Sequence, residues 1–500
     1  MYDKLLKTVT NLGSPKVLVV GDFMLDIYIY GDALRISPEA PVPVLKVHRT
    51  ECSCGGAGAV AKDLAALGAV PYCLGVVGKD QNGSKLKELL QQAGADISGL
   101  YIADDRPTIS KQRLIGLAQH RHQQQLFRMD EESTEALPAK LNKVLLQTYK
   151  DKLKKVDIVC LQDYNKGLLN SSICREMIES AARADKKVLV DPSLASDYKK
   201  YAGATLIAPN RQEASTVVGF EIKNEQDAAK AAKRLVKKLK VEAVVITLDK
   251  QGAYLKTKSK GEPIPTRPRS VYDVTGAGDM VLAILATTLA AGCDYKTAVQ
   301  LSNIAGGIEV EKFGVATVTI EEIINEIVSQ NRGKAGKLRT VDSLIAELAW
   351  YHRQKETIVF TNGCFDVVHR GHIEFLKFCK QQGDIVVVGL NSDSSVKTIK
   401  GQDRPINNQL DRAAVLAALE TVNYITIFDE PEPLALIKKV RPDVLVKGRD
   451  WAEKGVVGGD FVKSCGGKVV LAPIVKGKSS TATIEKMKSS QSYYPNRHKT

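Results

Sequence analysis

The chain has 500 residues, more than a single hydrophobic core usually supports, so two or three domains are expected. Hydrophobic residues make up 44% of it and charged residues 26%, which is ordinary for a soluble globular protein. The N-terminal residues lack the apolar run of a signal peptide, and no segment approaches the roughly 20 apolar residues that span a bilayer. We therefore expect a cytoplasmic protein that is not inserted in a membrane.

The nine cysteines are scattered, and only Cys52 and Cys54 lie close together. An odd number of dispersed thiols indicates a reducing compartment and disfavours a metal site built on sulfur. The net charge of +14 suits either a nucleic-acid-binding protein or an enzyme that collects anionic phosphates. Charge alone does not distinguish these two classes.

Short β-branched apolar runs alternate with amphipathic helical patterns along the chain. Strands are predicted over residues 16–20, 156–161, 187–190, 205–208, 243–247, 357–361, 385–390, 424–427 and 444–446. Helices are predicted over residues 58–67, 224–239, 280–291 and 411–419. Strands interleaved with helices indicate largely parallel sheets covered on both faces, so the predicted fold class is α/β.

The composition changes once, over residues 329–339, where SQNRGKAGKLR is polar, basic and glycine-containing. Such a segment is typical of a linker. We predict one domain over residues 1–330, a linker over residues 331–341 and a second domain over residues 342–500. Each of the two domains has its own glycine-containing nucleotide motif.

In the first domain, the motif DVTGAGD at residues 273–279 precedes an apolar helical run. Glycines followed by a helix gather backbone N–H donors at a helix N-terminus, which suits a phosphate. An aspartate in the same turn, Asp279, can accept a proton from a hydroxyl that attacks a phosphate. The alternative is a glycine turn with an N-capping aspartate and no ligand.

Further polar residues follow other strands of this domain. Asp22 and Asp26 come just after the first strand, Gly55 and Gly56 follow the segment GDALRISPEAPVPV, and APNRQE at residues 208–213 follows a later strand. Strand ends are where an open α/β sheet places its ligands. This context favours a phosphoryl-transfer site over a structural turn.

In this order, the motifs resemble those of the ribokinase-like (PfkB) sugar kinases over about residues 10–320, and most closely the heptose-phosphate kinases. GDFMLDIYIYGDALRISPEAPVPVLKV is similar to their N-terminal motif and VYDVTGAGD to their C-terminal one. The resemblance implies a ribokinase-like α/β sandwich in which Asp279 is the catalytic base and Glu213 binds Mg²⁺. The ATP-binding residues that it implies are Asn210, Arg211, Gln212, Glu213, Gly276, Ala277 and Gly278. The sugar-binding residues that it implies are Asp22, Gly55, Gly56 and Lys166.

One position departs from the family pattern. Members typically have GGAxN, whose asparagine contacts sugar hydroxyls, whereas this chain has Ala59 at that place. The loss of one buried hydrogen bond costs about 1–3 kcal/mol of binding. Either another group compensates for the missing amide or the kinase takes a different sugar.

The second domain contains FTNGCFDVVHRGHIEFL over residues 360–376, at the end of a predicted strand. His369 and His372 are three residues apart at a helix start, so both imidazoles lie on one side of a turn. Paired imidazoles can donate to nucleotide phosphates and stabilise the charge of departing pyrophosphate. The alternatives are zinc ligation, for which no convincing further ligands are nearby, and two unrelated surface histidines.

This second arrangement resembles the cytidylyltransferase-like HxGH nucleotidyltransferases, which have a Rossmann-like fold, over about residues 355–488. The matching segments are TNGCFDVVHRGH, VGLNSDSSVKTIKGQDRPINNQLDRAAVLAALE, RPDVLVKGRDW and GKSSTATI. The resemblance implies that His369 and His372 are catalytic and contact the ATP phosphates. The other nucleotide-binding residues that it implies are Thr361, Asn362, Phe365, Asp393, Lys400, Arg404, Lys447, Asp450, Ser479, Ser480 and Thr481.

The combined order resembles that of bifunctional heptose 7-phosphate kinases and heptose 1-phosphate adenylyltransferases of lipopolysaccharide synthesis. The resemblance implies phosphorylation of D-glycero-β-D-manno-heptose 7-phosphate at C1 and adenylylation of D-glycero-β-D-manno-heptose 1-phosphate, both with ATP and the first with Mg²⁺. It also implies small-molecule substrates, a homodimer and no nucleic-acid partner. Two alternatives stand beside it: an adenylyltransferase whose kinase domain has altered or lost sugar specificity, and a nucleic-acid-binding or regulatory protein with relic enzyme folds.

Overall fold

The computed structural model describes residues 2–116, 124–194, 197–267, 269, 276–312, 316–331, 336–451 and 455–473. The chain forms two compact units, one of Thr8–Ile323 and one of Met1–Lys7 with Ile324–Thr500. The division falls inside helix α10 (Ile320–Asn331), a few residues before the predicted end of the first domain.

The first unit is built on a nine-stranded sheet with the order β13-β12-β11-β10-β9-β8-β1-β4-β5, parallel except at β12 and β13. Its strands are β1 (Lys16–Gly21), β4 (Val70–Gly78), β5 (Asp96–Ala103), β8 (Ile158–Gln162), β9 (Lys187–Asp191), β10 (Leu206–Ile207), β11 (Ala243–Thr247), β12 (Ala253–Thr257) and β13 (Gly261–Ile264). The continuous apolar runs that predicted the central strands are buried on both faces, as a parallel sheet between helices requires.

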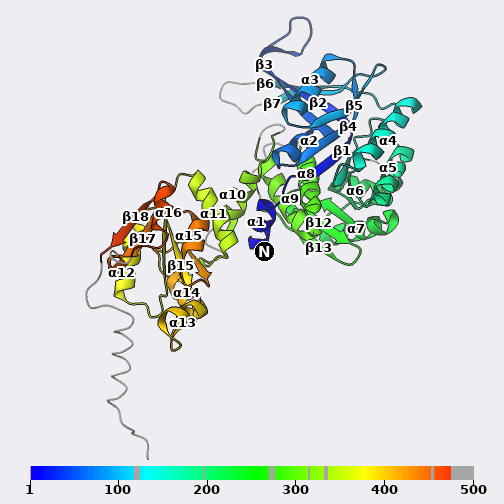
Figure 1. Ribbon diagram of the computed structural model, residues 1–500. Helices are drawn as coiled ribbons and strands as arrows, with labels where there is room; N and C mark the ends of the chain where they lie inside the picture. The colour runs from blue at the N-terminus through cyan, green and yellow to red at the C-terminus, as the bar shows by residue number, and fades with distance from the viewer. Residues whose placement is uncertain are drawn as a thin grey trace, which may run out of the picture. The chain divides into compact units, whose positions relative to one another are not determined.

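Helices cover both faces of this sheet (Figure 1). One layer contains α4 (Ala139–Leu153), α5 (Ser171–Arg183), α6 (Arg211–Val218) and α7 (Glu225–Leu239). The other contains α2 (Ala57–Ala66), α8 (Ala277–Ala290) and α9 (Tyr295–Glu309), which pack on one another. Helix α3 (Gln81–Gln92) packs beside β5. The prediction of an α/β fold is therefore confirmed.

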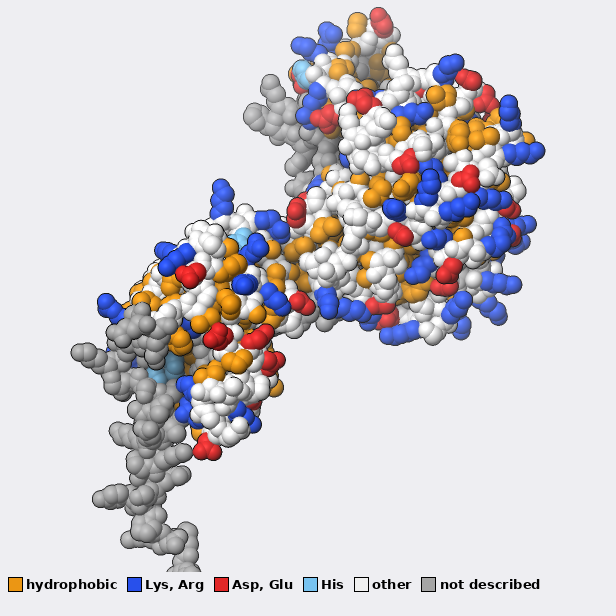
Figure 2. Space-filling model, viewed as in Figure 1, with side chains coloured by type: hydrophobic (Ala, Val, Ile, Leu, Met, Phe, Trp, Pro, Cys, Tyr) orange, Lys and Arg blue, Asp and Glu red, His pale blue; other side chains and the backbone are white. Residues whose placement is uncertain are grey.

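A second, four-stranded sheet with the order β3-β2-β6-β7 belongs to the same unit. It contains β2 (Phe23–Ile36), β3 (Pro43–Gly56), β6 (Ile109–Gly116) and β7 (Gln124–Glu131), and every residue of β7 is exposed. Several large apolar side chains of this sheet face solvent, among them Ile36 and Phe127, which are 63% and 61% exposed. In Figure 2, apolar side chains are visible among charged ones at this end of the unit.

The second unit has a five-stranded parallel sheet with the order β16-β15-β14-β17-β18. The strands are β14 (Ile358–Gly363), β15 (Ile385–Asn391), β16 (Tyr424–Phe428), β17 (Val444–Gly448) and β18 (Lys468–Ala472). The helices are α11 (Val341–Arg353), α12 (Arg370–Lys380), α13 (Asp393–Lys400), α14 (Gln409–Ala417), α15 (Leu434–Val440) and α16 (Gly459–Ser464). Separate apolar clusters lie on the two faces of the sheet, one around Phe360 and one around Val388.

The predicted linker contains structured residues at both of its described ends. Helix α10 continues to Asn331, and Leu338 forms a parallel bridge with Ile425 of β16. Arg339 is buried and its Nε donates to Glu347 of α11 at 2.5 Å. Within the described residues, no helix is both long enough and apolar enough to cross a membrane.

Candidate active sites

Asp279 lies in the first turn of α8, directly after a glycine turn. Gly276 caps the helix with φ +93°, a backbone conformation that favours glycine. The carboxylate is buried, and its Oδ1 accepts from Gln162 Nε2 at 2.7 Å and from the Tyr164 hydroxyl at 3.3 Å. The positive end of the helix dipole and the first N–H groups of α8 thus lie beside Asp279.

Buried acids surround this carboxylate. Burial, followed by the charges of Asp191 and Glu309, raises the pKa of Asp279 well above its usual range. The pKa of Asp191, at the end of β9, is raised to about 7 by burial and by the charge of Glu213. A cluster of like charges of this kind is stabilised when cations enter the site.

Asp22 follows β1 and is held by the loop after β8. Its Oδ2 accepts from the backbone N–H groups of Tyr164 at 2.9 Å and of Lys166 at 3.2 Å. Burial raises the pKa of Asp22 to about 6. At Gly56, where φ is +55°, a Cβ would lie 2.6 Å from the Asp22 carbonyl oxygen, so the close approach of β3 requires glycine. Gly55 is equally constrained, because a Cβ there would lie 2.3 Å from Asp26 Oδ2.

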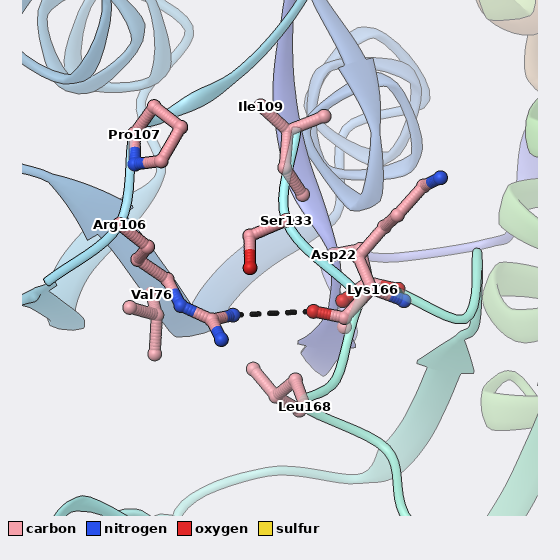
Figure 3. A pocket seen from close by; sticks show the side chains of 9 residues that line it. Asp22, Val76, Arg106, Pro107, Ile109, Ser133, Lys166 and Leu168 are labelled. Atoms are coloured by element: carbon pink, nitrogen blue, oxygen red, sulfur yellow. Dashed lines mark hydrogen bonds between the residues drawn. The ribbon is translucent and has the colours of Figure 1, made fainter. Parts of the chain in front are cut away.

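A small cavity lies beside Asp22 and is lined by Arg106, Lys166 and Ser133 (Figure 3). Arg106 donates to the Lys166 carbonyl oxygen at 3.2 Å, the contact drawn in Figure 3. The Lys166 ammonium pairs with Glu132 at 2.6 Å, so its charge is already balanced within the protein. The backbone of Lys166, rather than its ammonium, contacts Asp22.

The predicted ATP-binding segment after β10 begins helix α6. Asn210 and Glu213 form a capping box, in which the Glu213 carboxylate accepts from the Asn210 N–H at 2.8 Å and Asn210 Oδ1 accepts from the Glu213 N–H at 2.9 Å. The Arg211 guanidinium contacts Asp249 at 2.7 Å and the carbonyl oxygens of Ile222 and Leu248. Arg211 therefore anchors α6 to the loop after β11.

The other residues predicted to bind ATP lie at the starts of helices α6 and α8. Gln212 is in the first turn of α6, and Gly276, Ala277 and Gly278 form the start of α8. A Cβ on Gly278 would lie 3.8 Å from Asp191 Oδ2, so the start of α8 faces the end of β9. Residues 273–275 of the glycine motif lie outside the described residues.

The first unit supplies carboxylates suited to Mg²⁺, but its described residues do not form a complete set of metal ligands. Mg²⁺ is usually held by one or two carboxylates together with substrate phosphates. Glu213 and Asp191 are near enough for the charge of Glu213 to raise the pKa of Asp191, which supplies such carboxylates. Across the part of the chain that the structure describes, no group of three or more His, Cys, Asp or Glu residues is arranged to hold a metal ion by itself. The donor set therefore fits a metal ion shared with ATP phosphates.

In the second unit, His369 and His372 lie at the start of α12, after β14. Their rings stack with centroids 4.0 Å apart and an angle of 25° between planes, and the Phe365 ring is 5.2 Å from His372. The His369 N–H donates to His372 Nδ1 at 3.4 Å, which leaves the proton of a neutral His372 on Nε2. Burial, followed by His369 and Lys400, lowers the pKa of His372 to about 4. His372 is therefore a neutral N–H donor at pH 7.

A pocket beside His372 is lined by residues from the ends of β14 and β17 and from the helices and loops next to them. They include Asn362, Phe365, Lys400 and Trp451. Thr361 and Asn362 lie near the end of β14, and no described residue forms a hydrogen bond with the buried oxygens Thr361 Oγ1 and Asn362 Oδ1. Lys447 is buried beside them, with its Nζ 3.4 Å from the Asn362 carbonyl oxygen and 5.2 Å from the centre of the Trp451 ring.

Two predicted nucleotide contacts are already paired within the protein. Arg404 forms an ion pair with buried Asp366 at 2.5 Å, and Asp393 pairs with Arg412 at 2.7 Å. Arg412 is 1% exposed. Asp450 lies in the turn Arg449–Trp451, with its side chain outside the described residues, as are Ser479, Ser480 and Thr481 altogether.

Sequence reasoning missed several residues that organise the two sites. In the first unit these are Gln162, Tyr164 and Asp191. Gln162 and Asp191 directly follow predicted strands, so the strand-end rule that selected Asp22 was also a signal for them. In the second unit they are Asp366 and Arg412. Asp366 belongs to the TNGCFD segment, whereas Arg412, on a predicted helix, had no comparable signal.

Comparisons with known proteins agree with this division of the chain. The pfkB family carbohydrate kinase model matches residues 14–322, and the cytidylyltransferase-like model matches residues 360–468. The chain is 42% identical over 476 residues to "Bifunctional protein HldE" of a Nitratiruptor species, covering 95% of this chain and 99% of that protein. The protein of the same name from Campylobacter curvus is 43% identical, with 95% and 98% covered.

Solved structures show the fold of the first unit. Arabidopsis thaliana ribokinase complexed with ribose and ATP is 18% identical with a TM-score of 0.50, covering 63% of this chain and 99% of that one. Phosphofructokinase-2 from Escherichia coli, in complex with substrates and products, is 20% identical with a TM-score of 0.52, covering 64% and 100%. The chain is therefore a carbohydrate kinase of the pfkB family joined to a cytidylyltransferase-like nucleotidyltransferase, and it belongs to the family of bifunctional HldE proteins.

Proposed function

We propose that this enzyme catalyses two separate steps of ADP-heptose synthesis, between which another enzyme removes the 7-phosphate. The first unit phosphorylates D-glycero-β-D-manno-heptose 7-phosphate at C1 with ATP. The second unit joins AMP from ATP to D-glycero-β-D-manno-heptose 1-phosphate and releases pyrophosphate. The observation that carries the proposal is the presence of two sites in one chain: buried Asp279 at the start of α8, and the stacked pair His369 and His372 at the start of α12.

In the kinase step, Asp279 accepts the proton of the C1 hydroxyl as that oxygen attacks the γ-phosphorus. The ordered carboxylate of Asp22 binds sugar hydroxyls, and the N–H groups at the start of α8 face the phosphate. Glu213, with Asp191 nearby, would hold Mg²⁺ together with the ATP phosphates, and the ion would supply positive charge that offsets the charge of the transferring phosphoryl group. Burial of the site excludes water, which would otherwise accept the phosphoryl group.

In the second step, an oxygen of the sugar 1-phosphate attacks the α-phosphorus of ATP, and pyrophosphate leaves. The neutral imidazole of His372 donates through Nε2 to the triphosphate, and Lys400 and Lys447 add positive charge near the same pocket. These donors stabilise the charge that develops on the departing pyrophosphate. The buried oxygens Thr361 Oγ1 and Asn362 Oδ1 accept no hydrogen bond from the part of the chain that the structure describes, so they can accept one from a donor group of the nucleotide.

We also propose a cytoplasmic homodimer that forms through the four-stranded sheet of the first unit. Leu34, Ile36, Val47 and Phe127 are more than half exposed on its strands, and large exposed apolar side chains are candidates for an interface between copies of the chain. The double variant I36E/F127E is expected to be monomeric by sedimentation. An unchanged molar mass in that variant, or a monomeric parent protein, contradicts the proposal.

The test of the two activities uses the purified chain with magnesium-ATP. With heptose 7-phosphate, mass spectrometry follows the bisphosphate; with heptose 1-phosphate, an enzymatic assay follows pyrophosphate. We expect Asp279→Asn to lose only the bisphosphate and His372→Ala to lose only the pyrophosphate. If each variant loses both products, the two sites are not independent and the proposal fails.

A second candidate function rests on Ala59. This residue is buried in α2, three positions after Gly56, and its methyl group offers no hydrogen bond to a sugar. An adenylyltransferase with a kinase of different sugar specificity would have this feature. Pyrophosphate release without any bisphosphate from heptose 7-phosphate would favour it.

A further inference from the structure

Gln162 occupies a central position in the first unit that no step described above uses. It is the last residue of β8, and its register partner is Asp191, the last residue of β9. The side chain is 1% exposed. A buried amide at the carboxyl edge of a parallel sheet lies where such folds place their ligands.

The amide nitrogen of Gln162 joins two carboxylates. Nε2 donates to Asp279 Oδ1 and to Asp191 Oδ2, each at 2.7 Å. The two acceptor oxygens are therefore no more than 5.4 Å apart, which is twice the hydrogen-bond length. An amide NH₂ has only two N–H donors, so both are committed to these two acids. Oε1 of Gln162 is buried and accepts no hydrogen bond within the described residues.

We propose that Gln162 is a positioning residue of the kinase reaction, whose amide fixes Oδ1 of Asp279 and so directs Oδ2 to the sugar hydroxyl. This inference rests on the proposed role of Asp279 as the base. Oδ1 already accepts from Gln162 and Tyr164, whereas no hydrogen bond from the described residues reaches Oδ2. Because Oδ2 has no such partner, it is the oxygen available to a substrate.

The proton transfer then follows a single route. The O–H bond of the sugar hydroxyl breaks and its proton passes to Asp279 Oδ2. The hydroxyl oxygen forms a bond to the γ-phosphorus of ATP, the bond from that phosphorus to the β–γ bridging oxygen breaks, and ADP leaves. Asp279 must be ionised before this step, and two hydrogen bonds to one of its oxygens favour the ionised form.

The charged groups around Asp279 oppose its ionisation. Asp191 from β9, Glu309 from α9 and Asp26 from β2 all raise its pKa, in addition to burial. Asp63 of α2 interacts electrostatically with it as well. The Tyr164 hydroxyl lowers the pKa, and Gln162 is the second neutral donor in contact. Loss of the Gln162 amide therefore leaves a base that is protonated at higher pH.

The test compares the pH dependence of kinase kcat/KM in the full chain and in Gln162→Met, which keeps the length of the side chain but removes both donors. We expect the acidic limb of the profile to move up by about one to two pH units, since a hydrogen bond to an ionised group has effects of this size. Gln162→Asn retains an amide, so its acidic limb is expected to move less than that of Gln162→Met. Gln92→Met, on the exposed end of α3, is the control and should leave the profile unchanged.

A second measurement does not depend on any sugar. With ¹³C-labelled aspartate, the carboxyl resonance that disappears in Asp279→Asn reports the titration of Asp279 directly. Its midpoint should rise in Gln162→Met by the same amount as the kinetic limb. Pyrophosphate release by the second unit should be unchanged in all of these variants.

The possible outcomes test the role of Gln162 separately from the proposed sugar substrate. A Gln162→Met enzyme with uniformly lower activity, an unmoved pH profile and an unmoved carboxyl titration would show that Gln162 only fills space, and the inference would be overturned. A parent enzyme without activity on heptose 7-phosphate would refute the proposed substrate. In that case the carboxyl titration still decides whether Gln162 controls Asp279.

Discussion

Arg412 provides the sharpest test of how the second unit is held together. It is 1% exposed, and its guanidinium donates to the carbonyl oxygens of Cys364 at 2.6 Å, Asn391 at 2.8 Å and Asn407 at 3.0 Å, and to Asp393 at 2.7 Å. One side chain therefore joins the loop after β14, the end of β15 and the segment before α14. Arg412→Met keeps the apolar stem and removes all of these donors.

The expected cost follows from the partners that are left behind. A hydrogen bond from a charged donor contributes about 1.5–3 kcal/mol, and a buried acceptor that loses its donor costs about 1–3 kcal/mol. For the ion pair with Asp393 we take the low end of the 1.5–3 kcal/mol range, about 1.5 kcal/mol, because that carboxylate is 35% exposed. Allowing for relaxation around a smaller side chain, we expect the unfolding free energy of the second unit to fall by about 3–4 kcal/mol. At a urea dependence of about 2 kcal/mol/M, the midpoint falls by about 1.5–2 M.

The chain offers a selective probe for this measurement. Its two tryptophans, Trp350 and Trp451, both belong to the second unit, so intrinsic fluorescence in urea reports on that unit alone. Asp393→Asn is the matched control, with an expected loss below about 1 kcal/mol. If Arg412→Met lowers the midpoint no more than this control does, the guanidinium is not the structural centre of the site. Kinase activity should survive in both variants at urea concentrations that leave the first unit folded.

Three further predictions concern other groups. Asp279→Asn should lower kinase kcat by about 10²–10⁴-fold without changing pyrophosphate release, and a smaller loss in the kinase assay would exclude Asp279 as the base. The unfolding free energy of the second unit should fall as the pH is lowered from about 6.5 to about 4. The reason is that His372 takes up a proton near pH 6.5 in the unfolded chain but only near pH 4 in the folded one. Unfolding followed by tryptophan fluorescence should show a smaller loss of stability in acid for His372→Gln. Arg211→Ala should lower the melting temperature of the first unit by calorimetry with little change in the KM for ATP, since its guanidinium binds the loop after β11; a large rise in KM with unchanged melting would instead assign it to ATP.

Local sequence patterns show where functional residues lie along the chain, but not which residues they contact in the fold. Motifs locate residues along the chain, so they brought Asp279 to the start of α8 and both histidines to the start of α12. They do not state which charges are already paired. Arg404 and Asp393 were predicted from the sequence to bind the nucleotide, whereas the fold gives them Asp366 and Arg412 as partners.

The amino-acid sequence by itself determined the α/β class, the positions of nine strands and four helices and the segments that carry the chemistry, because hydrophobic periodicity and glycine motifs are local properties. Tertiary structure alone decided which acids share a site. Gln162 and Asp279 are separated by 117 residues, yet their hydrogen bond depends on β8 lying beside β9 and on α8 starting at that edge of the sheet. Burial then raises the pKa of Asp279 and lowers that of His372, because desolvation disfavours whichever form is charged. No single segment determines the strand order or the burial of a residue, since both arise from packing between segments far apart in the chain.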